Sequence, residues 1–462
     1  MTEAIDIAAR RELFVDERLI GEMKGARLAL QHPERREVAF ASDALWEDNV
    51  AGFNSLVQEG ESIRLYYRAS IRDLSDERDQ ILALAESTDG GRSFTRPRLG
   101  LCEFAGSKDN NILWIGGMPG VPPAFLDTSP DAKADQRYKG LCSEWEKLYA
   151  MCSPDGLRWR LMQEEPLEMD GTFDTVNTAF WDSLAGCYRC FTRYFKKLVP
   201  GTGAPTAPDA RSTGVRAIQS STSTDFVHWT PVVPHEYDDD FDDMQLYTNA
   251  TIPCPGAEHI YLSFPNRYVE QRITSPDHPY PGVNDALFMA SRDCIRWKRY
   301  PEAWVRPGPD ELNWTERNNY PTWGIVLTSA TEWSMYISEH YRHATERPRL
   351  RRLSVRPHRF VSACADFGGG ELVTKPITFT GRRLRLNYST SAAGFLRVEV
   401  QDSEGKPVKG FALDDMAPIF GDKLDAPVAW KGGGDLSRLA GTPVRLRFAL
   451  RDADFFAFRT AN

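Results

Sequence analysis

The stretch "ESTDGGRSF" (Glu86–Phe94) follows the apolar run "ILALA" and ends in an aromatic residue. An apolar run that leads into Ser, Asp and Gly is typical of a β-strand entering a tight turn. The same combination of Ser, Asp and a closing aromatic residue recurs along the chain. Its copies are "CSPDGLRW" (Cys152–Trp159), "TSTDFVHW" (Thr222–Trp229), "ASRDCIRW" (Ala290–Trp297) and a degenerate copy, "LSVRPHRF", that ends at Phe360.

These copies are evenly spaced. The closing residues Phe94, Trp159, Trp229, Trp297 and Phe360 are 65, 70, 68 and 63 residues apart. Each copy follows a short apolar strand pattern, and the interval between copies holds room for the other strands of a four-stranded unit. A repeat of this length with one landmark turn per unit predicts a β-propeller, with one blade for each of the five copies.

The repeat stops near Gly368. Beyond it, "TKPITFTGRRLRLNYSTSAAGFLRVEVQDSEGKPVKGFALDD" and "GTPVRLRFALRDADFFAFR" alternate apolar and polar residues between Gly and Pro turns. This pattern is typical of a small antiparallel β-sandwich. The predicted fold class is therefore all-β, a five-bladed β-propeller followed by a small C-terminal β-sandwich. The predicted domains are an N-terminal segment (1–30), the propeller (31–365) and the sandwich (366–462).

Composition excludes several classes of protein. A net charge of −9 argues against a nucleic-acid partner, and no stretch of 18 apolar residues predicts a membrane span. The N-terminus lacks a signal-peptide core, and eight scattered cysteines fit reduced thiols, so a cytoplasmic location is expected. Cys187 and Cys190 form a lone CxxC without a second ligand pair, which indicates structural cysteines. No metal or cofactor is expected.

Candidate site residues come from the expected blade geometry. The first strand of a blade begins where the antiparallel second strand ends, so both positions ring one mouth of the central channel. The carboxylates assigned there as catalytic are Glu47, Asp48, Asp127 and Asp174. The candidate substrate-binding residues are Trp46, Arg68, Asn110, Asn111, Arg193, Gln245, Tyr247, Arg267, Trp314, Glu339 and His340. The turn residues Asp89, Asp155, Asp225 and Asp293 are expected to bind their own backbone instead.

The repeat, the motif of Trp46 and its following acids, "FLDTSP" at Asp127 and the expected sandwich together resemble the five-bladed glycoside hydrolases of families 32 and 43. The resemblance implies an Asp nucleophile or base in the first blade, a second Asp and a general-acid Glu. Glu47 or Asp48 matches the first position. Asp127 matches the second, although "LDT" replaces Arg-Asp-Pro. The third falls at Asp174, where the families have Glu, so the acid stays open among Asp174, Asp242, Glu316 and Glu339.

The predicted function is therefore a glycoside hydrolase, with furanosides among its candidate substrates. Such an enzyme needs one protonated acid and one ionised carboxylate on either side of the scissile bond. A sialidase-like hydrolase is a second interpretation, because Arg68, Arg193 and Arg267 could bind an anionic sugar. A non-catalytic carbohydrate-binding propeller is the third. A carbohydrate is the expected partner in all three, and self-association is left open.

Overall fold

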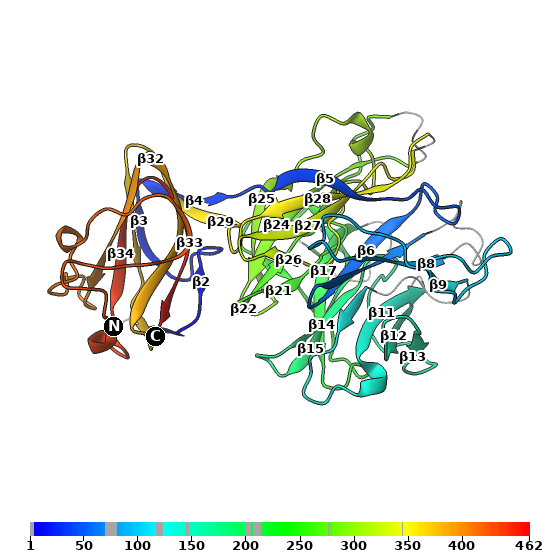
Figure 1. The fold of residues 1–462 in the computed structure, drawn as a ribbon, viewed down its shortest axis with the longest axis horizontal. Coiled ribbons are helices and arrows are strands. Elements are labelled where there is room, and N and C mark those ends of the chain that lie inside the picture. The colour runs from blue at the N-terminus through cyan, green and yellow to red at the C-terminus, as the bar shows by residue number, and fades with distance from the viewer. Residues whose placement is uncertain are drawn as a thin grey trace. The chain divides into compact units, whose positions relative to one another are not determined.

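The protein is described by a computed structural model over residues 4–69, 81–116, 123–144, 147–198, 205–206, 214–275, 278, 280–343 and 345–462. Nearly all regular structure in these residues is β-strand, with a few 3-10 turns such as η2 (Ala134–Gln136) and η3 (Glu311–Asn313). The chain divides into two compact units (Figure 1). One contains residues 33–253 and 258–355, and the other contains residues 1–32, 254–257 and 356–462.

The larger unit has the predicted β-propeller arrangement. Within its described residues, five separate sheets of four or more strands follow each other along the chain, one for each repeat of the sequence. From the inside outward, the first sheet contains β6 (Gly52–Glu59), β7 (Ser62–Arg68), β8 (Ile81–Ser87) and β9 (Ile112–Ile115), and the second contains β10 (Ala124–Leu126), β11 (Tyr138–Glu144), β12 (Lys147–Ser153) and β13 (Arg160–Leu161). The third contains β14 (Thr178–Asp182), β15 (Cys187–Leu198), β17 (Val215–Ser223) and β18 (Val233–Pro234), and the fourth contains β21 (Ile252–Cys254), β22 (Ala257–Ser263), β24 (Val283–Ser291), β25 (Arg296–Val305) and β19 (Glu236–Tyr237). The fifth contains β26 (Val326–Ser329), β27 (Glu332–Glu339), β28 (Arg349–Val355) and β5 (Glu34–Ala41). Three short strands, β16 (Pro205–Thr206), β20 (Gln245–Leu246) and β23 (Asn266–Val269), extend the third and fourth sheets.

The last sheet is completed by the beginning of the chain. Strand β5 pairs antiparallel with β28, so a segment before the first repeat supplies the outer strand that the fifth repeat lacks. Arg352 of β28 donates to Glu37 of β5 at 2.7 Å and to Glu332 at 2.6 Å. Strand β28 itself reads "RLRRLSV" and carries several of these basic side chains. The outer strand of the first sheet is β9, and of the preceding stretch "SFTRP" only Thr95 bridges to Glu86.

The recurring Asp residues bind their own turns. In the second copy, Asp155 Oδ1 accepts the backbone N–H groups of Leu157 and Arg158 at 2.8 Å, and Ser153 Oγ accepts that of Gly156 at 2.9 Å. The turns at Asp89, Asp225 and Asp293 use the same kind of bonds. These contacts satisfy backbone donors that the turn would otherwise leave open. The repeated carboxylates are therefore occupied in holding the hairpins together.

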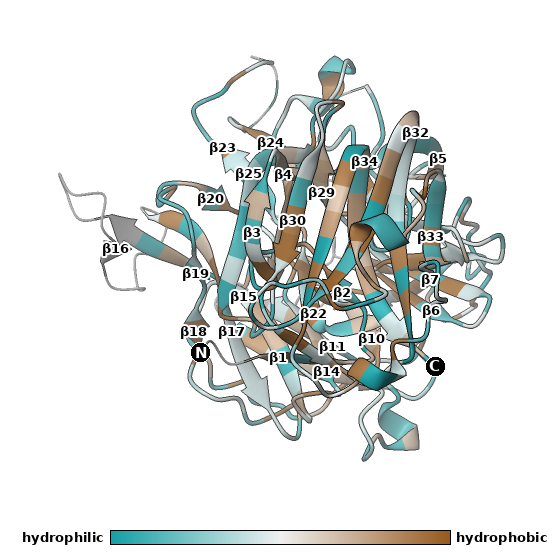
Figure 2. Cartoon of the chain, turned by 90° about the vertical axis from the view of Figure 1, so that its left-hand side faces the viewer, coloured by the Kyte–Doolittle hydropathy of each residue, from teal (hydrophilic) through white to brown (hydrophobic). Residues whose placement is uncertain are grey.

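The smaller unit is built on an eight-stranded sheet. The long strands β32 (Arg383–Gln401) and β34 (Arg445–Ala461) pair over most of their length, and Figure 2 shows apolar and polar residues alternating along them. Its remaining strands are β2 (Glu12–Leu13), β3 (Ile20–Lys24), β4 (Ala26–Leu30), β29 (Val361–Ala365), β30 (Gly370–Thr374) and β33 (Asp422–Pro427), with a separate pair, β1 (Ile5–Ala8) and β31 (Ile377–Phe379). The N-terminal segment therefore belongs to this unit through β3, which pairs with β30, and β4, which pairs with β29.

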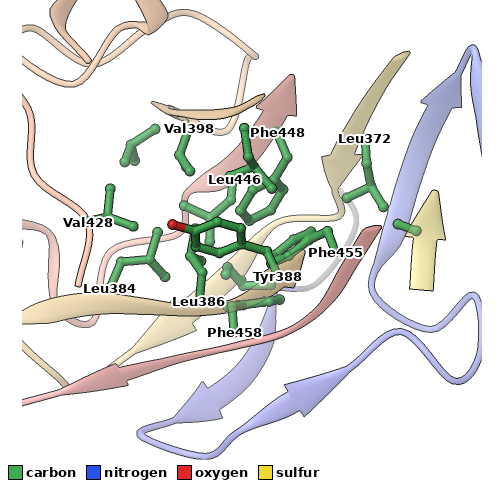
Figure 3. Close-up of a cluster of buried hydrophobic side chains, with 14 of the residues drawn as sticks. Leu372, Leu384, Leu386, Tyr388, Val398, Val428, Leu446, Phe448, Phe455 and Phe458 are labelled. Carbon is green, nitrogen blue, oxygen red and sulfur yellow. The ribbon is translucent and has the colours of Figure 1, made fainter. Parts of the chain in front are cut away.

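A core of aromatic and aliphatic side chains fills the smaller unit (Figure 3). The rings of Phe448 and Phe455 lie 4.4 Å apart, and Phe14 from the N-terminal segment lies 4.9 Å from Phe455. Burial of this apolar area stabilises the unit by about 25 cal/mol for each Å² removed from water.

In the described part of the chain, no helix is long and apolar enough to cross a bilayer.

Candidate active site

The inner strands of the propeller are joined by polar contacts at the centre of the unit. Ser55 of β6 pairs with Trp323, and its hydroxyl accepts the backbone N–H of Ala124 at 2.8 Å. Thr178 donates to Asn249 at 2.6 Å, and the Trp323 indole donates to the Thr251 carbonyl at 2.8 Å. These contacts bring the segments that precede the inner strands to one end of the propeller, where the sequence predicts a site.

Seven side chains at this end form what we call the arginine–tyrosine cluster: Arg68, Arg193, Arg216, Arg317, Arg342, Tyr247 and Tyr341. At its centre, Tyr341 Oη accepts from Arg68 Nη2 at 3.0 Å and from Arg317 Nη1 at 3.3 Å. The Arg342 guanidinium lies 5.4 Å from the centre of the Tyr341 ring. One buried phenol therefore contacts three guanidinium groups.

Tyr247 extends the cluster toward the third and fourth sheets. Its hydroxyl accepts from Arg317 Nη2 at 3.1 Å, and its ring centre lies 4.9 Å from the Arg193 guanidinium and 5.3 Å from that of Arg216. Both separations are within the range of a cation–π interaction. Arg216 also donates to Gln245, whose strand β20 pairs with β23. The structure thus brings Gln245 and Tyr247 into contact with the arginines of the cluster.

Two carboxylates face the cluster. Asp174, just before β14, is ion-paired with Arg193, and its side chain keeps 33% of its surface exposed while that of Arg193 keeps 3%. Glu316 lies between Arg317, whose Nε is 3.0 Å from Oε2, and Arg342, whose Nη1 is 3.7 Å from Oε1. Asp174 and Glu316 are connected through Arg193, Tyr247 and Arg317, so the structure brings a solvent-accessible acid and a buried acid to one cluster.

Asp48 lies next to the same cluster. The backbone N–H of Arg342 donates to the carbonyl of Asn49 at 2.7 Å, and Arg68 donates to the carbonyl of Val50 at 3.1 Å. The Asp48 carboxylate accepts from its neighbour Asn49 at 2.7 Å and keeps 29% of its side-chain surface exposed. Of the four catalytic candidates, the structure therefore brings Asp174 into the cluster and Asp48 beside it.

Glu47 is held away from the cluster. Its carboxylate accepts two bonds from Arg96, at 2.9 and 2.6 Å, one from Tyr67 and one from the backbone of Ala44. The side chain has no exposed surface. These four bonds and the burial fit a structural anchor at the start of the first sheet.

Asp127 lies at the other end of its inner strand. Strand β10 ends at Leu126, so Asp127 follows the strand, whereas Asp174 precedes β14. Its carboxylate is ion-paired with Lys139 Nζ at 2.7 Å, accepts from Tyr188 at 2.8 Å, and has no exposed surface. The structure therefore does not bring Asp127 together with Asp174.

The other predicted binding residues are engaged elsewhere. Arg267 forms two bonds to Asp285, at 2.9 and 2.6 Å, because it lies on the face of β23 opposite Tyr268. Glu339 accepts from Arg35, Arg349 and Arg351. The remaining contacts are those of Asn110 with the carbonyls of Cys102 and Ser107, Asn111 with Tyr67 and Leu84, Trp46 with Phe104, Trp314 with the Gly308 carbonyl, and His340 with Asp310.

Tyr341, Arg342 and Arg216 are absent from the sequence-based set of site residues. Strand β27 ends at Glu339, and the sequence-based set ends with His340 at this point of the chain. In the structure, His340 and Arg342 adopt φ of 63° and 60°, and these turns carry Tyr341 and Arg342 into the cluster. Such left-handed turns of non-glycine residues are uncommon and redirect the chain sharply. The only signal in the sequence is the polar run "SEHYRH" directly after an apolar strand.

Tyr341 is electrostatically unusual among the tyrosines. Burial by itself raises the pKa of its phenol, but Arg68, Arg317 and Arg342 outweigh the burial and bring the pKa below its ordinary value. The pKa of the neighbouring Tyr320, by contrast, is raised by burial. A positive field that favours the charged form of a group explains the direction at Tyr341.

We expect Tyr341 to ionise at a lower pH than an ordinary tyrosine. Phenolate absorbance followed on raising the pH should show an early transition in the wild-type protein that is missing from Tyr341→Phe. Tyr280→Phe, an exchange at an exposed ring, should keep the transition. Identical titrations of the wild type and Tyr341→Phe would contradict the assignment.

Comparisons with known proteins concern the fold. No family model matches the chain, and no curated protein does. Similar solved structures include an N-acetylgalactosamine deacetylase from F. plautii in complex with blood group B trisaccharide (10% identity, TM-score 0.45, covering 73% of this chain and 97% of that one). A family 43 arabinoxylan arabinofuranohydrolase from Bacillus subtilis in complex with cellotetraose is similar at 10% identity and a TM-score of 0.40, covering 89% of this chain and 96% of that one. The catalytic domain of a Coprinopsis cinerea GH62 α-L-arabinofuranosidase is similar at 9% identity and a TM-score of 0.44, covering 70% of this chain and 97% of that one. Glycoside hydrolases are thus among the similar folds, and these likenesses assign no residue in this chain.

Proposed function

We propose that the chain is a glycoside hydrolase that cleaves its substrate at the arginine–tyrosine cluster. The observation that carries the proposal is the placement of Asp174 and Glu316 on two sides of one cluster of arginine and tyrosine side chains. Glycoside cleavage requires such a pair of carboxyl groups, one to protonate the leaving oxygen and one to attack or to activate water. Asp48, beside the cluster, is the third acid within this end of the propeller.

The side chains around the acids suit the binding of a sugar. Tyr247 offers a partly exposed ring and Gln245 an amide, while the arginines hold the carboxylates in fixed directions. Asp174 is oriented by Arg193 and partly exposed, so we assign it the role of base or nucleophile. Glu316, whose Oε1 lacks a hydrogen-bond partner among the described residues, is the candidate general acid.

Hydrolysis tests this proposal directly. Wild-type protein should release product from at least one member of a panel of aryl glycosides, furanosides included, and oligosaccharides. Glu316→Gln keeps the size of the side chain and removes its acid, so we expect about a 100-fold or greater loss of turnover on the same substrate. Glu311→Gln, a matched exchange at an exposed Glu of η3, should leave turnover unchanged.

A carbohydrate-binding propeller without catalysis is the alternative outcome of the same experiment. In that case the wild type would bind an oligosaccharide of the panel and leave it intact. Full activity in Glu316→Gln would instead contradict the assignment of the acid while leaving the proposed reaction in place.

A further inference from the structure

The arginine–tyrosine cluster carries more positive charge than its own acids balance. It contains five guanidinium groups, and the carboxylates that face it are those of Asp174 and Glu316. Among the described residues, no carboxylate lies within 4.0 Å of Arg68 or Arg216. The whole chain, by contrast, has a net charge of −9. The excess is therefore local to this end of the propeller.

The same arginines have unused donors. The Nε atoms of Arg68, Arg193, Arg216 and Arg342 are buried and lack a hydrogen-bond partner among the described residues, whereas Arg317 Nε lies 3.0 Å from Glu316 Oε2. The Arg193 and Arg342 side chains are only 3% and 9% exposed, so bulk water does not replace those partners. Leaving a buried donor unpaired costs about 1 to 3 kcal/mol, more for a charged group. Four such donors beside an excess of guanidinium groups favour an anion as the ligand of this cluster.

Arg68, Arg317 and Arg342 define where the ligand's negative charge would lie. All three contact the Tyr341 side chain. The pKa of that phenol is lowered by the same three guanidinium groups, whose positive field favours a negative charge. An anion bound beside the Tyr341 phenol would lie in the combined positive field of three guanidinium groups from different segments of the propeller.

The chemistry of the donors selects the class of anion. Planar guanidinium groups form paired hydrogen bonds with carboxylates, and several of them converging on one point suit a single oxyanion. A polyanion such as a nucleic acid would also meet the negative charge of the rest of the chain. The partly exposed ring of Tyr247 would be the surface for the sugar ring.

We propose that Arg68, Arg317 and Arg342 bind the carboxylate of an acidic sugar, a uronic or sialic type of residue. This assignment of the substrate class rests on the proposed glycoside hydrolase function. If both hold, the glycosidic bond that is cleaved lies next to the acidic sugar. The assignment also replaces Arg193 and Arg267 of the sequence-based arginine set, because Arg193 pairs with Asp174 and Arg267 with Asp285.

Binding of free sugars tests the proposal without any reaction. Calorimetry on the wild-type protein would compare galacturonate, glucuronate, mannuronate and N-acetylneuraminate with the methyl ester of each, which removes only the charge. We expect at least one acid to bind about 10-fold or more tightly than its ester, since a charged hydrogen bond is lost. If every acid binds no better than its ester, the proposal is overturned.

Variants locate the effect. Arg68→Gln and Arg317→Gln should each remove most of the preference for the acid, and Arg68→Lys should retain part of it because the charge remains. Arg98→Gln, at a side chain that is 83% exposed, is the matched control and should keep the full preference. Near-ultraviolet circular dichroism identifies any variant that has lost its fold. A sulfated monosaccharide that binds more tightly than every carboxylate would overturn the choice of a carboxylate.

The two proposals fail separately. Acid-selective binding without hydrolysis of any acidic oligosaccharide would keep the carboxylate site and remove the enzymatic function. Hydrolysis of a neutral glycoside, with no preference between acids and esters, would keep the glycoside hydrolase and remove the carboxylate site.

Discussion

Asp174→Asn is expected to lower turnover about 100-fold or more while the fold stays intact. The amide keeps the size of the side chain and an oxygen that Arg193 can still bond, but it can neither accept a proton nor attack a sugar carbon. Because Arg193, the partner of Asp174, is only 3% exposed, the exchange should also lower the free energy of unfolding, by about 1 to 3 kcal/mol. Initial rates and denaturant unfolding of the same preparation measure both quantities.

A matched exchange separates loss of chemistry from loss of a charge. Asp131→Asn changes an exposed Asp in the loop after β10 and should leave rate and stability unaltered. If Asp174→Asn retained the full wild-type rate on a substrate that Glu316→Gln does not cleave, Asp174 would only orient Arg193, and Asp48 would be the next candidate for the base.

The propeller is predictable from sequence because each unit repeats a turn whose chemistry is local. Ser153 and Asp155 bond to the backbone within three residues of themselves, so their spacing alone reveals the hairpin. The closure of the last sheet has no such signal. Strand β5 reads "ERREVAFA", which is too charged to show a clear alternation, and its partner β28 lies about 300 residues further along the chain. Pairing at that distance depends on the whole ring having formed.

The site is less predictable because it depends on which face or end of a strand a residue occupies. Arg267 and Tyr268 are neighbours, yet only Tyr268 approaches the cluster, 4.9 Å from the Arg216 guanidinium. A shift of one residue along a strand moves a side chain to the opposite face. Asp127 illustrates the other error. The sequence pattern places Asp127 at the start of the inner strand of the second sheet, whereas strand β10 ends just before Asp127.

Asp127→Asn is expected to destabilise the protein by about 3 to 5 kcal/mol. Lys139 and Asp127 are 5% and 0% exposed, and the Lys139 Nζ lies 2.7 Å from Asp127 Oδ2. Removing the negative partner leaves a buried ammonium group whose desolvation is no longer offset, although Tyr188 still lies 2.6 Å from it. The resemblance to family 32 instead implies a catalytic Asp127, for which the same variant would fold normally and lose activity.

Removing both charges distinguishes these two roles. In Asp127→Leu combined with Lys139→Met, no uncompensated charge remains, and replacing a buried ion pair by apolar side chains of similar volume is often neutral or stabilising. We therefore expect the double variant to recover most of the free energy of unfolding lost in Asp127→Asn, as measured by denaturant unfolding, and to cleave the same substrate as the wild type. A stable double variant without activity would return Asp127 to the catalytic residues. Recovery of both properties would assign the pair to the fold, because the reaction would then proceed without the Asp127 carboxylate.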